Sequence, residues 1–269
     1  MFNSQSRRPK RNDTAEFHSR AIQRVISRIR ERLDETLSLR EMAAVAYMSR
    51  YHFNRTFRQV TGVPPRHFFF GLRLEAATRM LLDTDNSITD ICFDVGYNSL
   101  GTFIRRFSTA LGVSPMRLRM LGRAPASSLL ALAGNDVGFG PITAGPSIRG
   151  RVQAPPSFSG PIFIGLFPGP IPEGAPLACA ICLKPEAYLL APVPRGRHYV
   201  FALGLPWPDT VNDYFRYDTA VRAGGELVTV ADDTVECAEI CLREALPTDP
   251  PILLNLPVLL TKNTIRNAA

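Results

Sequence analysis

The sequence predicts a protein with α and β domains: an all-α domain of seven helices with two helix-turn-helix units, then an all-β sandwich of about seven strands. The first observation is a near-repeat, "LREMAAVAYMSRYHFNRTFRQVTGVPP" at 39–65 and "ITDICFDVGYNSLGTFIRRFSTALGVSP" at 88–115. The second is the proline content, because residues 1–123 contain 4 of the 23 prolines and residues 124–269 contain 19. Proline interrupts helices and favours loops and strand ends, so the first domain ends near residue 123.

Charge divides the chain at the same place. Residues 1–123 hold 21 of the 31 Lys and Arg residues and 11 of the 24 Asp and Glu residues, a net charge of +10. The remaining residues carry a net charge of −3. A basic, helical first half indicates a polyanionic partner, while the second half shows no such preference.

The first unit has the pattern of two helices joined by a tight turn. Met42, Ala43 and Ala46 form the inward face of a short helix, after an opening helix over 15–33. Ser49 is a suitable N-cap for the second helix. Phe53 and Phe57 then lie four residues apart on one buried face, and Gly62 ends the helix.

The second unit repeats this pattern. Equivalent positions are held by Ile91, Cys92, Val95, Ser99, Phe103, Phe107 and Gly112. The alignment pairs Tyr47 with Tyr97 and makes Gly96 the extra residue of the second turn. A connecting helix over 64–83 has a length of about 30 Å, close to the ~34 Å between successive major grooves on one face of B-DNA. A last helix is expected over 114–121.

The outer faces of the two second helices carry the candidate DNA-binding residues, because long donors such as Arg and Asn can reach base edges in a major groove. The alternative for one such helix is a solvated basic face, and the matched second copy argues against it. The candidates are Arg50, Tyr51, Asn54, Arg55, Arg58, Leu100, Gly101, Thr102, Ile104, Arg105 and Arg106.

The motif "DICFDVGYNSLGTFIRRFSTALGVSPMRLR" resembles the signature of AraC/XylS-type bacterial transcription regulators. The resemblance covers about residues 15–122, since both units and the connecting helix occur in order. It implies a seven-helix domain that contacts two successive major grooves of double-stranded DNA. By position, Tyr51, Asn54 and Arg55 belong to the first reading helix.

The second reading helix departs from this pattern. Leu100, Gly101 and Ile104 offer no hydrogen bonds to bases, so this helix either contacts thymine methyl groups or positions the protein through its arginines. Arg55 and Arg105 are either base readers or phosphate contacts, and Tyr51 either reads DNA or packs on the surface. Many members of the family place the sensing domain first, whereas here it follows.

The second half is expected to contain a linker over 123–145, a sandwich for sensing or oligomerisation over 146–246 and an apolar tail over 247–269, while residues 1–14 form a basic arm. "YLLAPVPRGRHYV" at 188–200 resembles transthyretin-like or carboxypeptidase regulatory-like sandwiches, which implies a binding or scaffold module. The tail has three possible roles: covering the sandwich, docking on the first domain or contacting another subunit. The predicted strands are 147–153, 161–167, 177–183, 187–190, 198–205, 226–230 and 234–242.

Two features of this half invite sharper interpretations. Trp207, Tyr214 and Arg216 offer a stacking site for a small ligand, with local packing as the alternative. The pairs Cys179/Cys182 and Cys237/Cys241 together supply four thiols, which is enough ligands for a zinc site. Residues three apart on a strand point to opposite faces, however, so buried hydrophobic cysteines are preferred and no metal or cofactor is predicted.

No catalytic constellation is visible after residue 146, and His198 lies on a predicted strand, so an enzyme is not expected. No apolar run is long enough to cross a bilayer, and no secretory signal opens the chain, which predicts a cytoplasmic bacterial protein without membrane partners. The expected partners are DNA, a small-molecule effector, RNA polymerase and a second copy of the chain. The alternative function is a constitutive or architectural DNA binder whose sandwich only mediates protein contacts.

Overall fold

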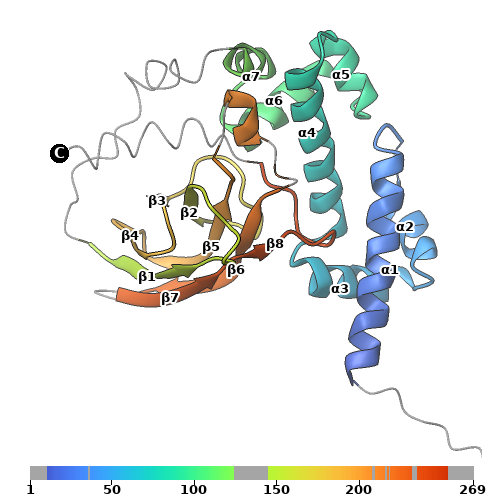
Figure 1. The fold of residues 1–269 in the computed structure, drawn as a ribbon. Helices are drawn as coiled ribbons and strands as arrows, with labels where there is room; N and C mark the ends of the chain where they lie inside the picture. The colour runs from blue at the N-terminus through green and yellow to red at the C-terminus, as the bar shows by residue number, and fades with distance from the viewer. Residues whose placement is uncertain are drawn as a thin grey trace, which may run out of the picture.

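The computed structural model describes residues 11–35, 37–123, 145–207, 210–215, 217, 219–231 and 235–253. In these residues, seven helices precede two β-sheets, as predicted (Figure 1). The helices are α1 (Arg11–Glu31), α2 (Leu39–Val45), α3 (Arg50–Thr61), α4 (Pro65–Asp83), α5 (Ile88–Asp94), α6 (Leu100–Leu111) and α7 (Pro115–Gly122). The predicted linker, apart from its end residues, lies outside the described residues, as do most of the basic arm and the tail beyond Leu253.

Serine caps begin five of these helices, because a serine hydroxyl accepts a hydrogen bond from a backbone N–H in the first turn. Ser38 does so for α2 and forms a full capping box with Glu41. The same cap begins α3, α5, α6 and α7. Gly62 and Gly112 end α3 and α6 in the left-handed conformation, with φ of 78° and 72°.

Helix α4 connects the two units by contributing to both of their cores. Phe68 and Leu72, from its first half, pack with Phe53 and Phe57 of α3. Leu74, Ala77 and Leu81, from its second half, pack with Phe103 and Phe107 of α6. Since one continuous helix of 19 residues joins the two cores, the units have little freedom to move independently.

The turns of the two units differ from the predicted alignment. Tyr47 has a φ of 55° and occupies the place that Gly96, with a φ of 80°, has in the second unit. Equivalent hydrogen bonds run from Tyr47 N–H to Ala44 O and from Gly96 N–H to Phe93 O. The pairing of Tyr47 with Tyr97 was therefore wrong, and Asn98 is the extra residue of the second turn. Consistent with this, Tyr47 is 87% exposed and Tyr97 only 6%.

Arg73 of α4 lies beside Gly96 of the second turn and binds the residues that follow α1. Its guanidinium donates to the carbonyls of Leu33 and Glu35 at 2.8 and 2.9 Å and stacks on Phe69 at 4.3 Å from the ring centroid. Burial lowers the pKa of this arginine, and the two carbonyl acceptors compensate part of the cost of burying its charge.

Gly96→Ala is expected to destabilise the helical domain by about 2–4 kcal/mol. An added Cβ would lie 2.6 Å from Leu33 O and closer still to the Arg73 guanidinium, in a left-handed backbone. Gly62→Ala is the matched control, because its φ is also positive but its Cβ would meet nothing within 4 Å. We expect about 1–2 kcal/mol for this control. Denaturant unfolding followed by helical circular dichroism measures both, and equal losses would contradict the prediction.

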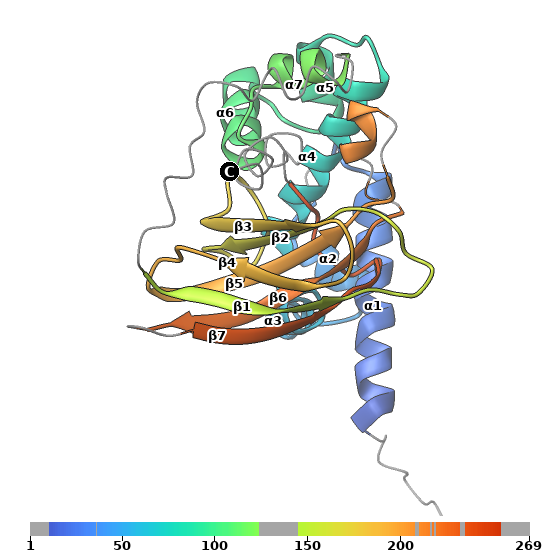
Figure 2. The same cartoon turned by 60° about the vertical axis from the view of Figure 1, so that its left-hand side comes forward.

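The second part is a sandwich of two sheets with one shared core (Figure 2). The three-stranded sheet has the order β4 (Ala187–Leu190), β1 (Ser147–Gln153) and β7 (Val235–Cys241), with β1 and β7 parallel. The five-stranded sheet has the order β3 (Ala178–Cys182), β2 (Ile162–Phe167), β5 (Gly196–Gly204), β6 (Val221–Val230) and β8 (Arg243–Glu244). Strand β8 was not predicted.

Strand β6 begins at Val221, five residues before its predicted start. The ladder with β5 shifts register where Phe201 pairs with Gly224 and Val200 with Glu226, so Gly225 is an extra residue. Gly225 has a φ of 86°, which glycine adopts readily. This β-bulge interrupts the alternation of apolar residues and explains why the sequence pattern shows only the second half of the strand.

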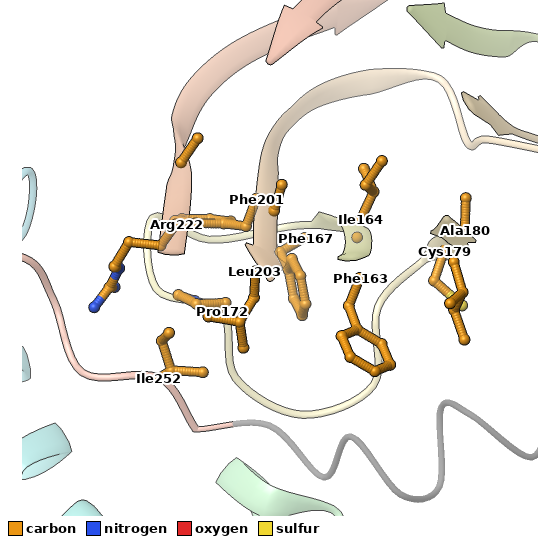
Figure 3. A pocket seen from close by; sticks show the side chains of 14 residues that line it. Phe163, Ile164, Phe167, Pro172, Cys179, Ala180, Phe201, Leu203, Arg222 and Ile252 are labelled. Atoms are coloured by element: carbon orange, nitrogen blue, oxygen red, sulfur yellow. The ribbon is translucent and has the colours of Figure 1, made fainter. Parts of the chain in front are cut away.

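The five-stranded sheet is buried on both faces. Ile162, Ile164 and Leu166 of β2 face the three-stranded sheet, whereas Phe163 and Phe167 face the opposite way. Figure 3 shows Phe163, Phe167, Leu203 and Ile252 around a cavity on this second face. Its volume is about 30 Å³, room for about one water molecule. The cavity is therefore too small for an effector.

Two segments of the sandwich part, residues 170–174 and 250–253, pack against both helical units, and we call them the docking segments. They pair through a parallel bridge between Glu173 and Leu253. Gly174 N–H donates to Ala110 O of α6 at 2.5 Å. Ile171 packs in the core of the first unit and Leu253 in that of the second. The start of the predicted tail therefore docks on the helical domain, one of the three roles considered for it.

Candidate nucleic-acid interface

The outer face of α3 presents its candidate residues to solvent. Phe53 and Phe57 are fully buried on the inner face, which turns the rest of the helix outward. Tyr51 is 82% exposed, so it does not pack on the surface. Arg50, Asn54, Arg55 and Arg58 are also exposed, and in the described part of the chain these three arginines make no ion pair. Their donors are free to bind a ligand.

Helix α6 has a more apolar outer face. Gly101 and Arg105 are exposed, and Ile104 is 37% exposed. Leu100 and Thr102 are half-buried, and Leu100 packs partly against the core of the second unit. The face therefore offers one long donor, Arg105, beside a surface suited to apolar contact.

Arg106 does not lie on this face, which differs from the prediction. Its side chain is half-buried, and its guanidinium lies over the Phe70 ring of α4 at 4.3 Å from the centroid. Successive residues of an α-helix point about 100° apart, so Arg105 faces solvent while Arg106 turns toward α4. We therefore separate Arg106 from the candidate reading residues.

The two faces are held apart by α4, with α3 near one end of this helix and α6 near the other (Figure 1). Its 19 residues correspond to about 28 Å at the rise of an α-helix. This length is close to the ~34 Å separation of successive major grooves. Two helix-turn-helix units fixed at such a distance, each with an exposed reading helix, define a bipartite DNA-binding domain.

Comparison with known proteins agrees with this class. The family model described as "Helix-turn-helix domain" matches residues 42–120. The Transposon Tn10 TetD protein of Escherichia coli is 32% identical over 107 residues, which are 40% of this chain and 78% of that protein. The chain belongs to the AraC family of helix-turn-helix transcription regulators.

Further relatives match over the same region. The MmsAB operon regulatory protein of Pseudomonas aeruginosa is 34% identical over 91 residues, 34% of this chain and 30% of that protein. The DNA-binding domain of AdpA, solved in complex with a target DNA, is 32% identical and covers 37% of this chain and 90% of that chain, with a TM-score of 0.36. The chain spans 30–42% of the length of the first curated relatives it matches.

The loop of the sandwich that contains Tyr214 and Phe215 packs against the helical domain. Phe215 is 3% exposed and belongs to the core of the second unit, with Tyr214 packed against it. Trp207 is 58% exposed, and Arg216 lies outside the described residues. Burial raises the pKa of Tyr214, as expected for a phenol used in packing. These contacts favour the local-packing alternative over a ligand site.

The cysteine pair of β3 points in two directions, as predicted. Cys182 lies in the core between the sheets, and Cys179 lies on the opposite face of the same sheet. Burial raises the pKa of Cys182 to about 11, so this thiol stays protonated at neutral pH. No group of three or more metal-binding side chains occurs among the described residues, and the side chain of Cys237 is not among them.

Sequence reasoning missed a basic groove beside the interface. Arg66 and Phe70 of α4 line it together with Arg105 and Arg106. The spacing of Arg66 and Phe70, four residues apart in "PRHFFFG", was a signal that they share a helix face.

None of the described helices combines the length and apolar character needed to cross a membrane.

Proposed function

We propose that this protein is a sequence-specific transcription regulator whose two helix-turn-helix units read adjacent major grooves. The observation that carries this proposal is the pair of exposed, unpaired donor faces at opposite ends of α4. Arg55 and Asn54 suit base edges, and Arg50 and Arg58 suit phosphates. On α6, Arg105 supplies the polar contact, and Leu100 and Ile104 suit thymine methyl groups.

The sandwich is the sensing or subunit-contact part of this proposal. Its resemblance to transthyretin-like modules and its packing on the helices support such a role. Because the docking segments contact both units, a signal that shifts the sandwich would act on both reading helices. A ligand would regulate DNA binding by favouring one arrangement of the two parts. Contacts with RNA polymerase or with a second copy would come from the same part.

Selection from a random DNA pool with the purified full chain tests the proposal. We expect an enriched motif with two conserved blocks whose centres lie about 10–11 base pairs apart, one for each reading helix. Deep sequencing of the bound fraction measures the motif. Absence of any enrichment would contradict sequence-specific binding. A single conserved block would contradict a reading role for one of the two units.

A further inference from the structure

A groove of about 600 Å³ lies between α4, α6 and the docking segments. This volume is typical of sites for small organic ligands. One wall comes from the helical domain and the other from the sandwich part, so an occupant would touch both. Arg66, Phe70, Tyr97 and Arg106 line its helical wall, and Glu173 and Leu253 line the opposite wall.

Two guanidinium groups converge on one ring at the helical wall. The Arg66 and Arg106 guanidinium carbons lie 5.4 and 4.3 Å from the centroid of Phe70. Neither arginine, nor Arg105 beside them, forms an ion pair in the part of the chain that the structure describes. Glu173, on the opposite wall, is the only acidic residue among the described lining residues. The groove therefore concentrates positive charge that the described residues do not neutralise.

Tyr97 adds a buried donor to this wall. Its side chain is 6% exposed, and its hydroxyl oxygen lies near the Arg106 guanidinium, which can only donate, so the O–H itself has no acceptor among the described residues. Burial raises the pKa of this phenol, and the charges of Arg106 and Arg73 oppose the rise. A buried O–H without an acceptor is costly. An oxygen atom that reaches past Arg106 would supply it.

We infer that this groove binds a small organic anion, with its carboxylate or phosphate head against Arg66 and Arg106. Planar guanidinium groups bind both kinds of head through paired, charge-assisted hydrogen bonds. The apolar part of the anion packs against Leu74, Ile171 and Leu253, which lie along the same groove. The binding site itself stands on these contacts, whereas its regulatory effect rests on the proposed function.

The regulatory effect follows from the position of the groove. Arg105 lies both in its lining and on the outer face of α6. The docking segments hold the opposite wall, and Gly174 is hydrogen-bonded to the end of α6. Occupancy therefore changes the contact between the sandwich and the second reading helix. A ligand that binds one arrangement more tightly shifts the population of DNA-competent molecules.

Calorimetric titration of the full chain with succinate and with inorganic phosphate, at constant ionic strength, tests the site. We expect one of these two probes to bind wild type, and Arg66→Ala to bind it at least tenfold more weakly. Arg66 is an exposed helical residue, so alanine preserves the fold. Arg40→Ala, which removes an exposed arginine on α2, is the matched control and should bind as wild type does. Silence with both probes, or equal affinity in Arg66→Ala, would overturn the inference.

A second measurement separates a free anion from the phosphates of DNA. Without either probe, Arg66→Ala should bind the selected DNA within about twofold of wild type. A loss as large as that of Arg105→Ala would assign the groove to the DNA backbone and overturn the small-anion site. Probe binding without DNA binding would retain the site and reject the proposed function. DNA binding without probe binding would reject the anion site and retain the proposed function.

Discussion

Alanine at Arg55 or at Arg105 is expected to weaken binding to the selected DNA by about 10- to 100-fold in each case. Both side chains are exposed on the outer faces of their reading helices and lack ion pairs within the described residues. Each guanidinium presents a planar set of donors that matches guanine or phosphate acceptors. Removing it leaves those acceptors without a partner in the complex. Fluorescence anisotropy with labelled DNA at fixed salt measures the loss.

The fold should not change in either variant. Neither arginine contributes to the cores of the two units, so the unfolding midpoint should stay near that of wild type. Arg24→Ala, at an exposed position on α1, is the control for a simple loss of charge and should bind DNA almost normally. If both reading variants retained wild-type affinity, the assignment of these two helices to DNA reading would be wrong.

The same variants distinguish base reading from phosphate contact. Loss of a side chain that reads a base relaxes the sequence preference at one position of the selected motif. Loss of a phosphate contact weakens binding to all sequences alike. We expect a positional effect for Arg55, which has Asn54 beside it and polar neighbours along α3. For Arg105, the apolar surroundings of Ile104 and Leu100 leave it as the main polar contact of α6. Its loss should therefore cost affinity even on unrelated DNA.

Local signals explain why the helices could be predicted closely. Ser49 and Ser99 cap α3 and α6, and Gly62 and Gly112 end them, as the sequence pattern predicts. A cap is a contact between residues a few positions apart, so it is visible in the sequence. The paired phenylalanines fix the inner face in the same way. The exposed positions of Tyr51, Asn54 and Arg55 follow from that face.

Other features depend on contacts that are distant in sequence. The packing of Arg106 on Phe70 involves two helices, and helical periodicity alone does not show which side of α6 faces α4. The position of the extra residue in the second turn was also ambiguous. The segment "AYMS" can be aligned with "VGYNS" by pairing Tyr47 either with Tyr97 or with Gly96. The groove requires Glu173 and Leu253 to pair across 80 residues, which no local pattern indicates. The sequence indicated part of the basic wall of the groove through the spacing of Arg66 and Phe70, but it did not indicate the opposite wall.

The affinity for DNA is expected to fall steeply with added salt. The helical domain carries the whole positive excess of the chain, and Arg50, Arg55, Arg58 and Arg105 are exposed on its reading helices. Each phosphate neutralised by such a side chain releases a condensed counterion. With about four phosphate contacts, the slope of log K against log salt is about −3.6, a loss of about 150-fold between 50 and 200 mM salt.

Arg58→Ala makes the salt prediction specific to the proposed surface. Arg58 is exposed on the last turn of α3 without an ion pair in the described residues, a position suited to a phosphate contact. Its removal should make the slope about 1 unit less steep while leaving the selected motif unchanged. Titrations of wild type and Arg58→Ala at four or more salt concentrations measure both slopes. A flat response in wild type would exclude groove binding by these helices, because no arrangement of arginines on DNA avoids counterion release.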